Sequence, residues 1–131
     1  MPQSIIKIFA HIVFSTKHRI DLISPEIEES LFRYIQGIIA NNEAHLIVAN
    51  GMTDHIHLLI SLPKQIDISG LVGDIKRDSS SWMKKQGTQF NNFYWQRGYG
   101  AFSVGQLEID IVKRYIENQK EHHKKKDFKA E

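Results

Sequence analysis

Two histidines separated by a single residue, His55 and His57, are the side chains of this sequence best placed to do chemistry. Because successive side chains of a β-strand point to opposite faces, both imidazoles would share one face of a strand. Two imidazoles at such positions can converge on one divalent cation. Half-exposed strand histidines without a role are the plainer alternative. The separation of polar from apolar side chains favours the metal site, since the face opposite the histidines carries only Ile56, Leu58, Ile60 and Leu62.

A tyrosine and a glutamine, Tyr115 and Gln119, lie one helical turn apart near the end of the sequence. A buried glutamine needs partners, because an unpaired buried amide costs a few kcal/mol. Separation by four residues places the phenol beside the amide, so one could react where the other binds. Ordinary core packing of the tyrosine is the alternative. At 100° per residue, both fall within an apolar arc formed by Leu107, Ile111, Val112 and Ile116.

Together these side chains offer two imidazoles, an amide and a phenol. Three neutral ligands would leave a divalent ion its full charge, which suits it to gripping a phosphate and withdrawing charge from a leaving oxygen. A mixed set of nitrogen and oxygen ligands favours Mg²⁺ or Mn²⁺ as the working metal, although imidazole also binds zinc or nickel. A phenol is a weak nucleophile unless its attack is helped. Its attack on a phosphodiester would give a phosphotyrosine, which stores the bond energy for rejoining without ATP.

Hydrophobic periodicity and turn residues predict the elements that must position these groups. Their order is β-α-β-β-α-β-α. The first six match the split βαβ, ferredoxin-like (RRM-like) arrangement of an α+β protein, an antiparallel sheet with helices on one face. The final helix, which carries the tyrosine, would cover part of the open face. The predicted elements are strand 5–15, helix 25–42, strand 44–49 ending at the turn Asn50-Gly51, strand 55–62, helix 67–87, an extended aromatic segment 90–104 and helix 106–123.

Composition predicts one cytoplasmic domain over residues 1–131. Hydrophobic residues make up 41% and charged residues 24%, as in ordinary globular proteins. The absence of cysteine excludes disulfides, thiolate metal sites, iron–sulfur clusters and cysteine nucleophiles. No apolar run approaches the roughly 18 residues that would span a membrane, and no secretory signal is recognisable. A basic tail begins at about residue 122.

Contacts with nucleic acid are predicted from side-chain type, because a net charge of +2 is too small to indicate them. Lys and Arg generally meet backbone phosphates, and aromatic side chains stack on unpaired bases. Core packing in the last strand is the competing interpretation for the aromatic residues. The candidates are Lys76, Arg77, Arg97 and the aromatic group Tyr94, Trp95 and Tyr99.

Residues 52–59, MTDHIHLL, resemble the His-hydrophobic-His motif of the HUH endonucleases. More specifically, the chain is similar to the single-tyrosine transposases of the smallest bacterial insertion sequences, the IS200-like, TnpA-type family. The motif alone is weak evidence, but further blocks occur in family order and the resemblance runs from about residue 9 to residue 123. These blocks are HIVFSTK at 11–17, WQRGYGAFSV at 95–104 and YIENQKEHH at 115–123.

The resemblance implies a role for each chemical group. Tyr115 matches the nucleophile, His55 and His57 match paired ligands of a divalent metal, Mg²⁺ or Mn²⁺, and Gln119 matches the third ligand. Members of the family cut single-stranded DNA at element ends, form a 5′-phosphotyrosine, free a 3′-hydroxyl and rejoin strands. They bind imperfect hairpins near each end. They act as homodimers in which the tyrosine helix of one subunit commonly serves the histidine pair of the other.

Two other functions are compatible with parts of the sequence. A noncatalytic ferredoxin-like nucleic-acid-binding protein would stack bases on aromatic residues of its central strands, yet His55 and His57 hold that face. A protein with a purely structural metal would need a fourth ligand, for which His122 is the evident spare.

Gly105, just before the final helix, is predicted to let that helix swing between subunits; the alternative is that it merely begins the helix.

Overall fold

The structure is a computed structural model that describes residues 5–121. Its strands form one antiparallel sheet in the order β2-β3-β1-β4, so the predicted ferredoxin-like order of elements is confirmed. The elements are β1 (Ile8–Ser15), α1 (Pro25–Asn41), β2 (His45–Met52), β3 (His55–Leu62), α2 (Ile68–Lys84), β4 (Gly100–Val104) and α3 (Ile109–Glu117), with 3₁₀ turns at Lys17–Arg19, Thr88–Phe90 and Gln106–Glu108.

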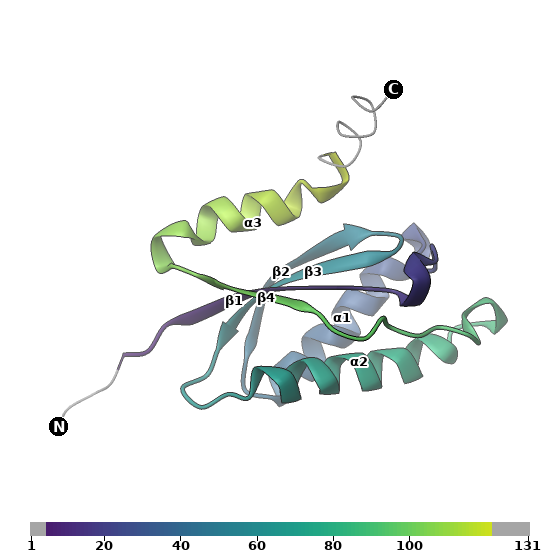
Figure 1. Cartoon of the computed structure of the whole chain (residues 1–131), viewed down its shortest axis with the longest axis horizontal. Coiled ribbons are helices and arrows are strands. Elements are labelled where there is room, and N and C mark those ends of the chain that lie inside the picture. The colour runs from purple at the N-terminus through teal and green to yellow at the C-terminus, as the bar shows by residue number, and fades with distance from the viewer. Residues whose placement is uncertain (1–4, 122–131) are drawn as a thin grey trace.

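The sheet lies between two layers of helix. Helices α1 and α2 cover one face, and α3 lies across the other (Figure 1). The main core fills the space between the sheet and the α1–α2 layer, because the aliphatic face of each strand and one stripe of each helix meet there. Among the described residues, no helix has both the length and the apolar character needed to cross a membrane. The core includes Ile12, Phe14, Leu31, Ile35, Ile56, Leu58, Ile60, Leu71 and Ile75.

The predicted turn at Asn50-Gly51 is wrong, because β2 continues through both residues to Met52 and the chain reverses at Thr53-Asp54. A glycine is needed at position 51 because the backbone of the neighbouring strand comes very close to it, and not because the chain turns there. A Cβ at this position would collide with the carbonyl oxygen of His55 on the neighbouring strand. Extending β2 in this way places Asn50 opposite His57 in the ladder.

The extended aromatic segment predicted over 90–104 forms a strand only over its last five residues, Gly100–Val104. Upstream, the chain makes one isolated bridge, between Thr16 and Trp95. Trp95 is 9% exposed and its indole Nε1 donates to Ser79 Oγ, so it packs in the core, whereas Tyr99 is 41% exposed. Burial of Trp95 against α2 therefore prevails here over the regular strand that aromatic residues favour.

The final helix begins later than predicted. It begins after a 3₁₀ turn and runs from Ile109 to Glu117. Its predicted apolar arc is wrong in the first half, where Leu107 is 96% and Ile111 65% exposed, whereas Ile116 is fully buried. Helix α3 therefore reaches the sheet mainly through its C-terminal half. The predicted end of the helix, the spare ligand His122 and the basic tail lie outside the described residues.

Candidate active site

The two histidines lie at the start of β3, on the sheet face that α3 covers. His55 and His57 are each 7% exposed, and their ring centroids are 5.2 Å apart. The alternating residues Ile56 and Leu58 are fully buried on the opposite face. The strand therefore fixes both imidazoles toward the same space because its other side is anchored in the core.

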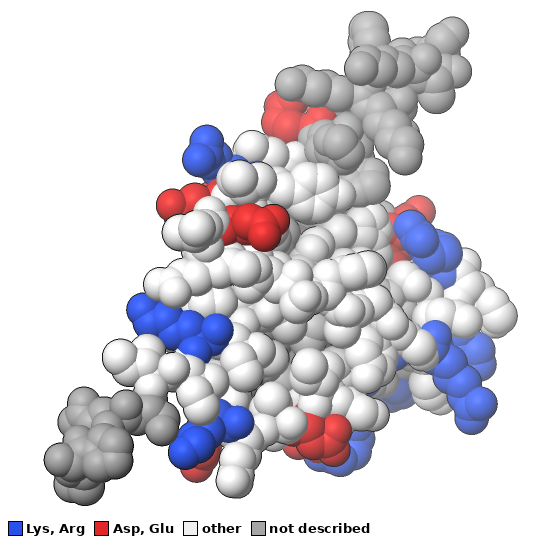
Figure 2. All heavy atoms as spheres, turned by 60° about the vertical axis from the view of Figure 1, so that its left-hand side comes forward, with Lys and Arg blue, Asp and Glu red and all other residues white. Residues whose placement is uncertain are grey.

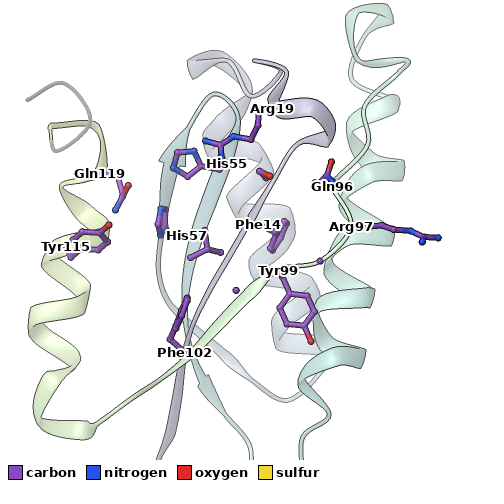
Figure 3. Close-up of a pocket in the computed structure, with 14 residues that line it drawn as sticks. Phe14, Arg19, His55, His57, Gln96, Arg97, Tyr99, Phe102, Tyr115 and Gln119 are labelled. Atoms are coloured by element: carbon purple, nitrogen blue, oxygen red, sulfur yellow. The ribbon is translucent and has the colours of Figure 1, made fainter. Parts of the chain in front are cut away.

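Helix α3 brings Tyr115 to this pair, and the segment that follows it brings Gln119 (Figure 3). The ring centroid of Tyr115 lies 6.1 Å from that of His57, and the phenol is 44% exposed. Gln119 is 1% exposed, and neither its Oε1 nor its Nε2 finds a hydrogen-bond partner in the part of the chain that the structure describes. The four side chains line one open cavity of about 560 Å³, together with Arg19 and the segment 96–100.

The carboxylate of Asp54, itself held by the guanidinium of Arg19, orients the imidazole of His55. Asp54 Oδ1 lies 2.7 Å from His55 Nδ1, and Asp54 Oδ2 accepts a hydrogen bond from Arg19 Nε at 2.9 Å. Burial raises the pKa of Asp54, but hydrogen bonds from His55 and Arg19 outweigh it, so the pKa is lowered overall. An ionised Asp54 makes His55 Nδ1 the donor, and coordination of a metal by His55 would then use Nε2.

A third imidazole, His11 on β1, orients His57. His11 Nε2 and His57 Nδ1 share a hydrogen bond of 2.9 Å, and the two rings stack with centroids 5.1 Å apart. Burial lowers the pKa of His11, which favours the neutral ring that this bond requires if His57 coordinates through Nε2. The ring of Tyr115 lies edge-on to His11, 6.3 Å away.

Sequence reasoning did not select Asp54, Arg19 or His11 as site residues. Asp54 carried a usable signal, because an acidic side chain directly before a metal-binding histidine is a common orienting partner. His11 could be found only from the strand register, which pairs His11 with Leu59 and so makes His57 its diagonal neighbour.

The predicted DNA contacts fall into two groups. Arg97 and Tyr99 line the cavity, with the Arg97 side chain directed away from the histidines (Figure 3). Lys76 and Arg77 are occupied by protein groups. The Lys76 ammonium donates to the carbonyl oxygens of Gln96 and Gly98 at 2.8 and 2.6 Å. Arg77 pairs with two carboxylates of its own helix, those of Asp74 and Asp78.

Charge is dispersed over the surface. In the face shown in Figure 2, Lys and Arg lie around the margin of a broad area without charged side chains. On this face, attraction for DNA phosphates would therefore come from separate side chains at the margin and not from one broad basic patch.

The donor set at the cavity fits a metal only if the amide takes part. Across residues 5–121, no group of three or more His, Cys, Asp or Glu side chains is arranged to hold a metal ion. The two imidazoles lie together, and at the same cavity the buried amide of Gln119 has no hydrogen-bond partner among residues 5–121. A cation at this point would satisfy the Gln119 oxygen, which is otherwise costly to bury.

A ferredoxin-like sheet that presents a histidine pair to a tyrosine on a separate terminal helix is the architecture of a single-tyrosine transposase. The sequence model of the family described as "Transposase IS200 like" matches residues 4–119, and the chain belongs to this family.

Known proteins agree with this assignment. The chain is 28% identical over 119 residues to the transposase for insertion sequence element IS200 of Salmonella typhimurium strain LT2, covering 87% of this chain and 78% of that protein. It is 26% identical over 114 residues to the ISDra2 transposase TnpA of Deinococcus radiodurans, covering 83% and 81%.

Two solved structures share the fold. One is a crystal structure of a protein from Deinococcus radiodurans R1, with a TM-score of 0.70, 24% identity and coverage of 91% of this chain and 98% of that one. The other is the REP-associated tyrosine transposase bound to a REP hairpin, with a TM-score of 0.71, 15% identity and coverage of 94% and 73%.

Proposed function

We propose that this transposase cleaves and rejoins single-stranded DNA at insertion-sequence ends through a 5′-phosphotyrosine on Tyr115. The observation that carries the proposal is the meeting of α3 with β3. The Tyr115 ring lies 6.1 Å from the His57 ring, and the amide of Gln119 is buried at the same cavity without a hydrogen-bond partner in the described part of the chain. A noncatalytic nucleic-acid-binding protein would have no use for this convergence, so we favour the enzyme.

The reaction exchanges one phosphodiester for another. Tyr115 Oη attacks the phosphorus, and the bond between the phosphorus and the 3′-oxygen breaks. The net reaction moves the phenolic proton to that oxygen, which leaves as a 3′-hydroxyl. A 3′-hydroxyl of a second strand then attacks the phosphotyrosine and releases the phenol. Because each step forms one phosphate ester bond and breaks another, no external energy source is needed.

His55, His57 and Gln119 would hold a divalent metal ion, Mg²⁺ or Mn²⁺. When bound, this ion supplies Lewis-acid stabilisation of the charge that develops on the phosphate and the leaving oxygen. Asp54 and His11 fix the orientation of the two imidazoles, so the ligands need little reorganisation on binding.

The proposed substrate is single-stranded DNA that folds into hairpins near the element ends. One relative of the same fold was solved with a REP hairpin, which supports this class of partner. Arg97 and Tyr99, which line the cavity, would contact a phosphate and an unpaired base. Lys76 would act by holding the 96–98 backbone at this rim. Arg77 would meet DNA only by exchanging its carboxylate partners.

We further propose that the protein acts as a homodimer in the cytoplasm, where bacterial DNA is processed. Large apolar side chains near the start of α3 and on β4 are exposed: Phe102 by 59%, Ile111 by 65% and Leu107 by 96%. A second copy that covers this surface, or exchanges α3 with it, would bury side chains that one chain leaves in water. In this single chain, Tyr115 lies beside the chain's own histidines.

The proposal is tested with single-stranded oligonucleotides that carry the sequences flanking the gene, incubated with protein and Mg²⁺ or Mn²⁺. We expect a denaturant-resistant protein–DNA adduct that Tyr115→Phe abolishes and that His55→Ala or His57→Ala strongly reduces. Tyr34→Phe, at a tyrosine of α1 outside the cavity, is the matched control and should form the adduct normally. Hairpin binding without any adduct would instead support the noncatalytic function.

A further inference from the structure

Polar contacts hold the tyrosine helix against the sheet. Ile116 is the single fully buried apolar side chain of α3, and Ile109 and Val112 are half-buried, so apolar burial alone anchors the helix weakly. The side-chain amide of Asn50, on β2, donates hydrogen bonds to the carbonyl oxygens of Ile116 and Glu117 at 3.0 and 3.1 Å. These carbonyls belong to the last turn of α3, where backbone acceptors lack the regular donor four residues further along the helix.

Lys120 adds a second tie between α3 and the rest of the protein. Its ammonium donates to both carboxylate oxygens of Glu28, on α1, at 2.8 and 3.0 Å. It also donates to Asn50 Oδ1 at 2.7 Å and to the carbonyl oxygen of Gly51 at 3.2 Å. The Glu28 side chain is only 18% exposed, so this ion pair is less screened than an ordinary surface pair. We refer to Glu28, Asn50 and Lys120 as the latch.

The latch acts next to the reacting groups. Asn50 lies opposite His57 in the β2–β3 ladder, so one strand position is tied both to the histidine strand and to the end of α3. Tyr115 directly precedes Ile116, and Gln119 directly precedes Lys120. Fixing the backbone at Ile116 and the side chain of Lys120 therefore fixes the phenol and the amide relative to the imidazoles.

We propose that Asn50 and Lys120 are positioning residues, which together with Glu28 keep Tyr115 and Gln119 at the histidine pair. Opening of the latch releases α3 from the sheet. The inference rests on the proposed function for its catalytic consequence, and it deepens that function by naming what sets the placement of the nucleophile.

The test compares Asn50→Ala and Lys120→Met with a matched control, Glu29→Gln. Glu29 pairs with Arg33 on the exposed surface of α1, one residue from Glu28, and that pair does not involve α3. Two quantities are measured: hydrogen exchange of the α3 backbone amides without DNA, and the rate of adduct formation at saturating oligonucleotide and metal. Hairpin affinity and the urea midpoint of the whole protein are recorded alongside.

Each latch variant should raise α3 amide exchange and slow adduct formation by about tenfold, the effect of losing one hydrogen bond to a charged group. Hairpin affinity and the urea midpoint should remain close to those of the wild type. Lys120→Arg should recover most of the rate because it keeps the charge and the donors.

Exchange and adduct rates in both variants equal to those of Glu29→Gln would overturn the proposal. A fall in the urea midpoint that accounts for the whole loss of rate would also overturn it, because the residues would then be merely structural. Failure of the proposed function looks different: the wild type would form no adduct with any oligonucleotide. Faster α3 exchange in the latch variants would still support the latch as the device that holds the helix.

Discussion

Replacing Asp54 with asparagine should weaken metal binding while leaving the fold intact. The carboxylate makes two charge-assisted contacts, at 2.7 Å to His55 Nδ1 and at 2.9 Å to Arg19 Nε. The amide keeps the size of the side chain and one acceptor oxygen, but it removes the negative charge that orients the imidazole and increases its basicity. Loss of such an orienting partner typically lowers metal affinity by about 10- to 100-fold. We expect about tenfold, because one acceptor remains.

The assay is a Mn²⁺ titration followed by electron paramagnetic resonance, with His55→Ala as the reference for loss of a ligand. Asp78→Asn is the matched control, since Asp78 pairs with Arg77 on the exposed surface of α2 and does not line the cavity. Equal Mn²⁺ affinity in Asp54→Asn and the wild type, together with a clear loss in His55→Ala, would refute the orienting role of the carboxylate.

Three further substitutions test other parts of the site. Gln119→Met should stabilise the metal-free protein by about 1 kcal/mol, because it removes a buried amide that has no partner within residues 5–121, and should also weaken Mn²⁺ binding; a destabilised metal-free protein in urea unfolding would contradict this. Gly51→Ala should destabilise the fold by about 2 kcal/mol in urea, because its Cβ would collide with the His55 carbonyl; an unchanged midpoint would show that the hairpin yields freely. Gly105→Pro should be tolerated in the fold, since φ is −68° there, yet slow strand joining if the helix swings; unchanged joining rates would count against a hinge.

Much of the fold follows from local sequence. The aliphatic alternation of β3 and the Ser24-Pro25 start of α1 are one-dimensional signals, and the structure agrees with both. The extent of β2 was not predictable in this way. Asn50-Gly51 is a good turn pair by composition, but a close approach between strands, a tertiary contact, requires Gly51 inside the hairpin.

The candidate site divides in the same manner. His55, His57, Tyr115 and Gln119 could be selected from spacing, and the structure places them around one cavity. His11 reaches His57 through strand register, a long-range property. For Lys76, the charge was visible in the sequence, but its use by two backbone carbonyls was not.

The central claim is that the phenol of Tyr115 becomes covalently joined to DNA. Mass spectrometry of the trypsin-digested adduct tests it most directly, because cleavage after Arg114 and Lys120 isolates the peptide from Tyr115 to Lys120. We predict that this peptide carries the mass of the bound nucleotides and that fragmentation assigns them to its tyrosine. Nucleotides attached to any other peptide, with Tyr115 unmodified, would contradict the claim.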